Sequence, residues 1–288
     1  MGLFDFLKKE EKSDRDKIFH KIHEQMTAMQ IVDQAISYRN LKQYDKAISL
    51  LKEAIRKYPA YLPAKTILGT TLAHSGDIDG AELQFNKILT EHAQRQDYPL
   101  VEVYANLGSL YHNDRKDIQT ALKYYQLALN APRPKEVRID DRTYEVMVSA
   151  VFCDLCSIYF RKQDFQLARQ YALKRLQTVN DCPTASRVNG HCLFFEVFQK
   201  GVDLDKDIKD ADLENIVECL QIVIKDSPMD YASIAFCATA LLFMRQMKFY
   251  SRRVESIRRE ESEYVERLKS EKAKDGYKIY QDFASKFS

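Results

Sequence analysis

The sequence predicts an all-α protein, organised as an α-solenoid of antiparallel helix pairs with an irregular helical C-terminal part. Glycine and proline, the residues that most often interrupt helices, are scarce, with 8 and 7 copies in 288 residues. Small and large apolar residues return at a spacing typical of helical hairpins. Hydrophobic residues make up 45% of the chain, so a sizeable core can be buried.

Four segments align when a small residue in the second helix of each pair is taken as the anchor. The first two anchors are separated by one hairpin repeat of about 34 residues. The anchors are Ala47, Ala81, Ala121 and Ala168. The residues that recur around them are Tyr38, Leu51, Leu68-Gly69, Phe85, Leu107-Gly108, Tyr111, Tyr125, Leu155-Cys156 and Tyr159. Small side chains let two helix axes approach closely, and the large ones fill the wider gaps.

This pattern resembles the tetratricopeptide-repeat (TPR) family, in which a large residue, Leu-Gly, Tyr, Ala, Phe, Ala and Pro stand at set positions. The resemblance covers residues Ala28 to Asp181. Two departures occur, because Gln34-Ala35 replaces Leu-Gly in the first repeat and Cys156 stands at the Gly position of the fourth. The resemblance implies stacked helix pairs in a TPR-like superhelix.

Three regions are expected along the chain. Residues 1–12 form a flexible N-terminal segment, residues 13–182 a TPR solenoid of about four repeats plus a leading helix, and residues 183–288 an irregular helical extension with capping helices. The longer separations between anchors predict insertions around Gln94–Pro99 and Arg133–Glu145. Both insertions fall between repeats, where longer loops are tolerated.

The C-terminal half is expected to be helical without a clear repeat. Arg187–Lys200 and Leu213–Lys225 are predicted to form a fifth helix pair. Met229–Met247 is apolar nearly all round, which predicts a buried helix.

The last part of the chain carries an amphipathic stretch, Phe249–Lys274, whose apolar stripe is interrupted by Glu261. A helix here is expected to cap the last apolar face, because terminal repeats need a polar-faced cover. The alternative is a homodimer formed through this helix. Tyr277–Phe287 is expected to add one short helix after Gly276.

In the TPR family the first helix of each repeat lines a concave groove that holds peptides. Carried over by position, the resemblance implies a groove lined by Met29, Val32, Ile36, Asn40, Thr66, Thr70, His74, Glu102, Asn106, Ser109, His112, Asn113, Ser157, Phe160 and Arg161. Val32 and Ile36 stand where some members carry the Lys and Asn that grip a terminal carboxylate, so such a clamp is disfavoured. We expect an extended or helical peptide, with its backbone held by Asn106 and Asn113.

The function that the resemblance implies is a non-catalytic scaffold or adaptor for a protein or peptide partner. The sequence contains no P-loop, GxGxxG, GxSxG or HExxH motif, and no cofactor is expected. Two alternatives stay open: a regulatory receptor for a small signalling peptide, and a metal-binding or enzymatic C-terminal half. The 44 basic and 42 acidic residues nearly balance, so nucleic acid is not expected as a partner.

The first candidate metal site in the sequence is an EF-hand-like calcium loop. Asp203, Asp205, Asp207 and Glu214 match four positions of the EF-hand loop. Ile208 stands where the sharp turn of that loop needs glycine, so a solvated linker is expected instead.

A second candidate metal site is the CxxC sequence formed by Cys153 and Cys156. It is predicted to lie in the middle of a helix, with Cys156 at a packing position, so we expect buried thiols rather than a redox or zinc site. In the zinc alternative, Cys182, His191 and Cys192 would supply the remaining ligands.

Localisation is expected to be cytoplasmic. The six cysteines are irregularly spaced, which favours reduced thiols over a disulfide framework. No stretch approaches the length of a membrane-spanning helix. The apolar residues of Leu3–Lys9 are compatible with weak membrane contact by the N-terminal segment; the alternative is an apolar plug that packs on the body.

Overall fold

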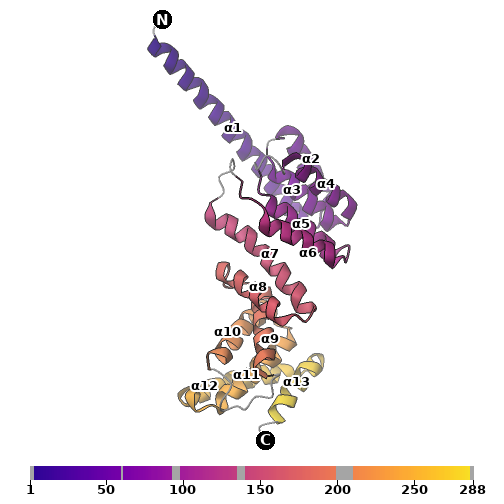
Figure 1. The fold of residues 1–288 in the computed structure, drawn as a ribbon, viewed down its shortest axis with the longest axis vertical. Coiled ribbons are helices and arrows are strands. Elements are labelled where there is room, and N and C mark those ends of the chain that lie inside the picture. The colour runs from indigo at the N-terminus through magenta and orange to yellow at the C-terminus, as the bar shows by residue number, and fades with distance from the viewer. Residues whose placement is uncertain (1–2, 60, 93–97, 135–139, 199–209, 286–288) are drawn as a thin grey trace. The chain divides into compact units, whose positions relative to one another are not determined.

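The computed structural model confirms the all-α architecture. It describes residues 3–59, 61–92, 98–134, 140–198 and 210–285. Within these ranges the chain forms thirteen α-helices and two short 3₁₀ helices. Their contacts divide the chain into two units, Met1–Asp140 (unit 1) and Asp141–Ser288 (unit 2). Figure 1 shows successive helices folding back on one another within each unit.

Unit 1 consists of three helical hairpins. Its helices are α1 (Leu3–Asn40), α2 (Tyr44–Lys57), α3 (Pro63–Ser75), α4 (Ile78–His92), α5 (Leu100–Asn113) and α6 (Ile118–Asn130). Each hairpin pairs a first helix (α1, α3 or α5) with the second helix that follows it. The first helices also contact one another in the order α1, α3, α5, so they form a continuous face of unit 1.

The tight turns within the hairpins share one backbone conformation. Lys42, Gly76 and Lys116 have φ values of 59°, 91° and 58°, and Gln163 in unit 2 has 60°. This left-handed region costs a non-glycine residue roughly 1–2 kcal/mol, so the surrounding helix packing must stabilise it. The recurrence shows that the repeat extends to the turn geometry, although only one of the four positions is glycine.

Close approach of the two helices in a hairpin depends on small residues. A Cβ added to Gly69 would lie 2.6 Å from Cε1 of Phe85, and one added to Gly108 would lie 2.7 Å from Cε1 of Tyr125. All four predicted anchors, Ala47, Ala81, Ala121 and Ala168, are fully buried. The predicted roles of the small and large residues in packing are therefore confirmed.

Unit 2 begins with two hairpins and continues into a helical cluster. Its helices are α7 (Asp141–Arg161), α8 (Phe165–Thr178), α9 (Pro183–Phe198), α10 (Asp210–Asp226), α11 (Tyr231–Gln246), α12 (Val254–Leu268) and α13 (Lys274–Ala284), with 3₁₀ helices η1 (Lys248–Arg253) and η2 (Glu271–Ala273). Helices α9 and α10 form the predicted fifth pair, in which a Cβ on Gly190 would lie 2.8 Å from Cδ2 of Leu220. The hairpin packing thus continues past residue 182, the predicted end of the solenoid.

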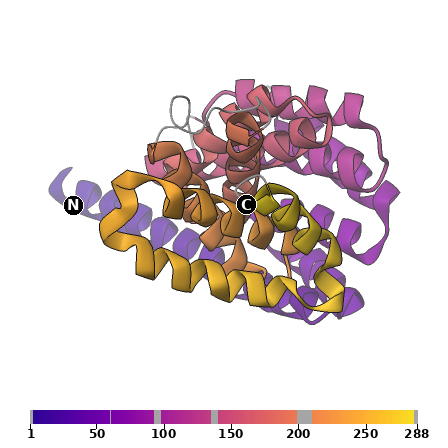
Figure 2. The ribbon, with the colours of Figure 1, turned by 90° about the horizontal axis from the view of Figure 1, so that it is seen from below.

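The C-terminal part of unit 2 is organised around α11. Every residue from Ser233 to Met244 is buried, as expected for a helix that is apolar on all sides. Figure 2 draws these C-terminal helices in orange to yellow. Helices α12 and α13 pack on α11, with Ile257, Tyr264 and Leu268 in the shared core. Helix α12 therefore covers the apolar face of α11, as the capping prediction requires.

Glu261, which interrupts the apolar stripe of α12, has a structural explanation. It is 4% exposed and pairs with Arg245, whose Nε lies 3.0 Å from Oε2 of Glu261. The hydroxyl of Tyr280 donates a hydrogen bond of 2.7 Å to Oε1. Since a buried charge needs such partners, this carboxylate ties α11, α12 and α13 together.

Several predicted boundaries differ from the structure. Helix α1 begins at Leu3, ahead of the expected start at residue 13, and α7 already includes residues 141–145 of the second predicted insertion. The stretch predicted as one helix over 249–274 is divided into η1, α12 and η2. Gly276 lies inside α13, where a Cβ would be 2.8 Å from the carbonyl oxygen of Tyr231. Its role is close packing, so it does not separate two helices.

Helix α7 is the one described helix that is long and apolar enough to cross a membrane, with 21 residues and a mean hydropathy of 1.3. This finding corrects the expectation that no stretch approaches the length of a membrane-spanning helix. Its Val151, Leu155 and Ile158 are buried, and the helix packs against α8 and α9. These contacts are those of a hairpin helix in a repeat protein.

Candidate peptide groove and neighbouring sites

A hollow of about 240 Å³ lies between α3 and α5 on the face formed by the first helices of unit 1. Five residues predicted to contact a peptide line it together: Thr70, His74, Asn106, Ser109 and Asn113. They come from two helices and share one face of each, because the spacings are three, four or seven residues. We call this hollow, together with the exposed surface of the same helix faces, the α3–α5 groove.

Asn106 is the most informative residue of the groove. Its Nδ2 atom is buried and has no hydrogen-bond partner in the described part of the chain. A buried amide donor without a partner loses roughly 1–3 kcal/mol of hydrogen bonding. Such a donor in the wall of a hollow is satisfied when a ligand brings an acceptor to it.

The other polar side chains of the groove are partly engaged. The Asn113 amide donates to Oγ of Ser109 at 2.9 Å, and a ring nitrogen of His74 lies 2.8 Å from the carbonyl oxygen of Thr70. Asn113 therefore keeps its amide oxygen for a ligand, while its nitrogen already has an acceptor. This differs from the expectation that Asn106 and Asn113 act alike.

Glu102 lies one turn before Asn106 on the same face of α5. Its side chain is half-buried, and burial raises the pKa of its carboxyl group. The nearby hydroxyl of Tyr98 is hydrogen-bonded to Thr66, and burial, assisted by the charge of Glu102, raises the pKa of that phenol. The structure therefore places Glu102 beside the contact between Thr66 and Tyr98.

Several predicted groove residues have other surroundings. Val32, Thr66 and His112 are 2%, 1% and 8% exposed, so little of these side chains is available to a peptide. Ile36 packs against the core shared by α1, α2 and α3, whereas Met29 and Asn40 are exposed on α1. The position of a residue in the repeat predicts its direction on the helix only to within about one residue. One residue corresponds to about 100° of rotation, which is enough to place a side chain in the core.

The predicted groove residues of the fourth repeat belong to unit 2. Ser157 donates a hydrogen bond of 3.1 Å to the carbonyl oxygen of Cys153, within α7. Phe160 packs against the rings of Phe165 and His191, and Arg161 is exposed. These three residues lie near the C-terminal end of α7.

Sequence reasoning did not include several residues at the α3–α5 groove. Arg39 of α1 donates a hydrogen bond of 3.2 Å to Oγ1 of Thr70, so it contributes a cation beside the groove. The hollow is further lined by Ala73, Phe85, Leu110 and Asp114. Arg39 had a usable signal, because it follows Ile36 by three residues on one helix face. Phe85 was assigned only to packing.

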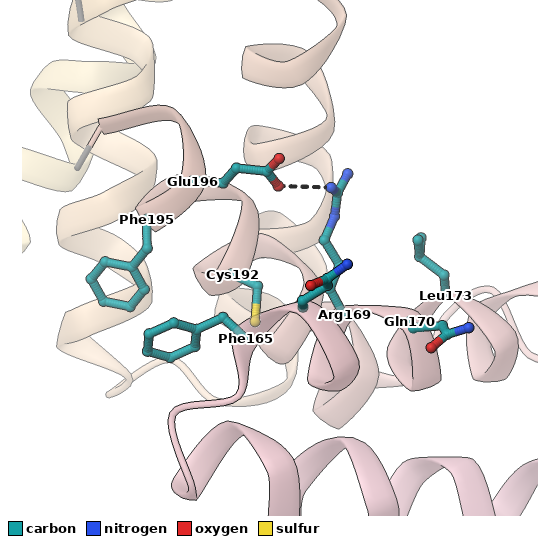
Figure 3. A pocket seen from close by; sticks show the side chains of 8 residues that line it. Phe165, Arg169, Gln170, Leu173, Cys192, Phe195 and Glu196 are labelled. Atoms are coloured by element: carbon teal, nitrogen blue, oxygen red, sulfur yellow. Dashed lines mark hydrogen bonds and ion pairs between the residues drawn. The ribbon is translucent and has the colours of Figure 1, made fainter. Parts of the chain in front are cut away.

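A second hollow, of about 530 Å³, lies between α8 and α9 in unit 2 (Figure 3). It is lined by Phe165, Gln166, Arg169, Gln170, Leu173, Cys192, Phe195 and Glu196. Figure 3 shows the two phenylalanine rings at one end and the pair formed by Arg169 and Glu196 at another side. Nη1 of Arg169 lies 2.9 Å from Oε2 of Glu196, and its Nε donates to Asn189. No sequence motif pointed to this hollow.

The cysteines are all free thiols. Sγ of Cys153 lies 3.8 Å from Sγ of Cys182, and Cys156 donates to the carbonyl oxygen of Cys153. The neighbouring Cys156 thiol raises the pKa of Cys153 to about 11. Over the described ranges, no group of three or more His, Cys, Asp or Glu side chains has metal-site geometry. Most of the EF-hand-like stretch, residues 203–209, lies outside the described residues.

Comparisons with known proteins agree with this packing. The sequence model named tetratricopeptide repeat matches residues 40–101. No curated protein shows significant similarity to the chain. The structure of pilF from Pseudomonas aeruginosa is similar, with a TM-score of 0.61 and 15% identity over 92% of this chain and 99% of that one. PilW, a type IV pilus biogenesis factor, has a TM-score of 0.50 and 12% identity, over 86% and 97% of the two chains.

At these identities the structural likeness shows the fold alone, while the matched residues 40–101 run from the end of α1 to the start of α5. The recurring anchors and turns extend the same hairpin design beyond that match. Proteins with such repeats generally bind other proteins or peptides and are usually non-catalytic. Residues 40–101 thus match the tetratricopeptide-repeat model, and the described helices pack as in a TPR-like superhelix.

Proposed function

We propose that this chain is a non-catalytic scaffold or adaptor that binds a peptide segment of a partner protein in the α3–α5 groove. The observation that carries the proposal is the buried Asn106 Nδ2 without a hydrogen-bond partner, placed in the wall of the hollow. A peptide backbone supplies carbonyl acceptors at regular intervals, which suits a single donor that must be satisfied on binding.

The remaining groove chemistry fits the same ligand. Ala73, Phe85 and Leu110 give the hollow apolar lining, while Thr70, Ser109 and Asn113 supply polar groups at its rim. Pockets of this kind bury an apolar side chain and fix the backbone with a few polar contacts. Exposed Met29 on α1 offers a further apolar contact on the face of the first helices.

A cytoplasmic location accompanies this proposal. All six cysteines are free, including the pair Cys153 and Cys182, whose sulfur atoms lie 3.8 Å apart. Such a pair is more readily kept reduced where thiol reductants are present.

Substituting Asn106 with Ala tests the proposal. Affinity capture with the full chain, quantified by mass spectrometry, should recover a partner that the Asn106→Ala variant retains at most about one tenth as well, since one hydrogen bond to a buried donor is worth roughly 1–3 kcal/mol. Asn86→Ala, an exposed asparagine on α4, is the matched control. Circular dichroism should show both variants folded.

Equal partner recovery by the wild-type chain and Asn106→Ala would show that the α3–α5 groove is not the binding surface. Loss of the partner in Asn86→Ala as well would point to a general defect. If the purified and dialysed chain converted a small-molecule substrate, and substitutions in the α3–α5 groove changed that rate, the scaffold proposal would be wrong.

A further inference from the structure

Glu102 is a half-buried carboxylate, and among the described residues no cation pairs with it. In the part of the chain that the structure describes, its side chain takes part in no hydrogen bond or ion pair. Burial raises the pKa of its carboxyl group. A partly desolvated charge without a partner is unfavourable, so its presence at this place needs an explanation.

Cations of the surrounding helices have other partners. Nζ of Lys65 on α3 lies 2.5 Å from Oε2 of Glu91. Arg39 on α1 donates to the hydroxyl of Thr70. Neither side chain lowers the pKa of Glu102. Neither of these two cations therefore neutralises the Glu102 carboxylate, and a ligand that brings a cation to the groove would do so.

A helix-terminus role does not account for the burial. Glu102 lies in the first turn of α5, where an acidic group interacts favourably with the helix dipole. Asp45 occupies the first turn of α2 and is exposed. The dipole effect is available to an exposed carboxylate, and burying the group only adds a desolvation penalty.

Glu102 and Asn106 are complementary groups, and among the described residues neither the carboxylate nor the amide nitrogen has a side-chain partner. They stand at positions i and i+4 of α5, where Cβ atoms are about 5–6 Å apart. One presents an acceptor with a full charge and the other a buried donor. A peptide residue with a cationic side chain meets both needs, because its own or a neighbouring carbonyl reaches Asn106 while its side chain reaches Glu102.

We infer that the α3–α5 groove selects a peptide that carries a lysine or arginine, whose cationic group pairs with Glu102 one helical turn from the backbone carbonyl bound by Asn106. This inference rests on the proposed peptide-binding function and adds the chemistry of the partner. Charge-assisted hydrogen bonds of this kind are roughly twice as strong as neutral ones, and arginine can bind the carboxylate with two parallel bonds.

The test uses a phage-displayed library of random 12-residue peptides selected on the full chain. Enriched peptides should share one basic position, and their affinity should be measured by calorimetry with synthetic copies. Replacing that basic residue of the peptide by Gln should weaken binding to the wild-type chain about tenfold or more. Raising the salt concentration should weaken the wild-type complex as well.

Glu102→Gln completes a double-mutant cycle with the Gln peptide, and Asp45→Asn is its control. Glu102→Gln should bind the basic peptide about tenfold more weakly than the wild type and should no longer distinguish it from the Gln peptide. Asp45→Asn, which removes an exposed first-turn carboxylate, should keep full affinity and preference. Circular dichroism should show that Glu102→Gln stays folded, and Glu102→Ala provides a second variant with the same expected loss.

The outcomes distinguish failure of the peptide groove from failure of the role inferred for Glu102. If peptides bind and depend on Asn106, but show no basic preference or bind Glu102→Gln equally well, the inference about Glu102 is wrong and the groove stands. If Asn106→Ala leaves peptide affinity unchanged, or no peptide is selected at all, both the groove and the inference fail.

Discussion

Unit 1 and the C-terminal part of unit 2 bury their apolar residues in different ways. Unit 1 divides its core between hairpins, with one cluster around Ala47 and Leu51 and another around Ala81 and Phe85. The C-terminal part of unit 2 has a single large cluster that joins α9 to α13 around the fully buried segment of α11. The first arrangement is local, and the second is shared by five helices.

This difference determines where a ligand surface can form. Stacked hairpins bury the contacts between neighbouring helices and leave one face of α1, α3 and α5 open. A helix buried on all sides, such as α11, leaves no such face. Regular repeats therefore provide the candidate groove, while the irregular end provides a cover for the last hairpin. The predictions below test this comparison, from the largest expected effect to the smallest.

The largest effect is expected for Phe236→Ala in α11. Phe236 stacks on Phe194 with ring centroids 4.2 Å apart and meets His191 edge-on at 4.8 Å. Removing a buried phenylalanine ring costs about 3–5 kcal/mol. Hydrogen exchange followed by mass spectrometry should show faster exchange across α9 to α13.

The matched substitution in unit 1 is Phe85→Ala, at a residue 1% exposed. Its loss should be of similar size, but faster exchange should be concentrated in α3, α4 and α5, because Phe85 packs within the cluster of those helices. Equal spreading of both effects over the whole chain would contradict a division into local and shared cores.

A change of pH should act on the two units with opposite signs. Burial lowers the pKa of His191 from 6.5 to about 4, so this ring is neutral in the folded protein and lies 2.9 Å from Oγ of Ser233. Its contribution to stability is present above pH 6.5 and is lost as the pH falls towards 4. Unit 2 should lose about 2–3 kcal/mol over that interval.

Glu102 in unit 1 behaves in the opposite way, since its pKa is raised in the folded protein. Its protonated form favours folding, so unit 1 should gain stability as this carboxyl group takes up a proton. Exchange rates corrected for intrinsic pH dependence measure both units at once. His191→Gln should flatten the profile of unit 2, and an unchanged profile would show that this residue does not govern its acid sensitivity.

Close-packed glycines distinguish rigid from adjustable contacts. A Cβ on Gly276 meets the backbone oxygen of Tyr231, whereas a Cβ on Gly108 meets the side-chain ring of Tyr125. Overpacking costs about 1–3 kcal/mol and the higher helix propensity of alanine returns up to about 1 kcal/mol in each case. Urea unfolding should show a net loss near 2 kcal/mol for Gly276→Ala and near 1 kcal/mol for Gly108→Ala. A larger loss for Gly108→Ala would reverse the assignment.

The smallest effects are expected at helix N-caps. Asp117 accepts a hydrogen bond of 3.0 Å from the backbone of Thr120 at the start of α6, so Asp117→Ala should cost about 1 kcal/mol. Asp230 caps α11 in the same way and also pairs with Arg187 at 2.7 Å. Thermal unfolding should therefore show a larger loss for Asp230→Ala. Equal losses would mean that the ion pair contributes little.

Much of the hairpin design could be predicted from residue pattern. The anchors Ala47, Ala81, Ala121 and Ala168 are all buried, and the fifth pair is confirmed as α9 and α10. The sequence carries a further signal for that pair, since Gly190 follows Cys156 by one repeat length of about 34 residues. Helix ends were less predictable. Glutamate and lysine favour helix at the start of α1, and Gly276 is retained in α13 by its contact with Tyr231.

The groove was predictable as a helix face, but its individual contacts were not. Thr70, His74, Asn106, Ser109 and Asn113 line one hollow, as their repeat positions suggested. The burial of Val32 and Thr66, the contact of Arg39 with Thr70 and the engagement of Asn113 by Ser109 depend on how neighbouring helices are rotated. Rotation by a fraction of a turn leaves the pattern of small and large residues unchanged.

The sequence by itself determined that the chain folds into stacked helical hairpins, because helix propensity and the return of small residues are properties of the chain alone. Tertiary structure decided which polar groups have partners. Among the described residues it left the amide nitrogen of Asn106 without a hydrogen-bond partner, while it gave Glu261 both Arg245 and Tyr280. Hydrogen bonds and ion pairs depend on distances of a few tenths of an ångström between helices far apart in sequence, and only packing sets those distances.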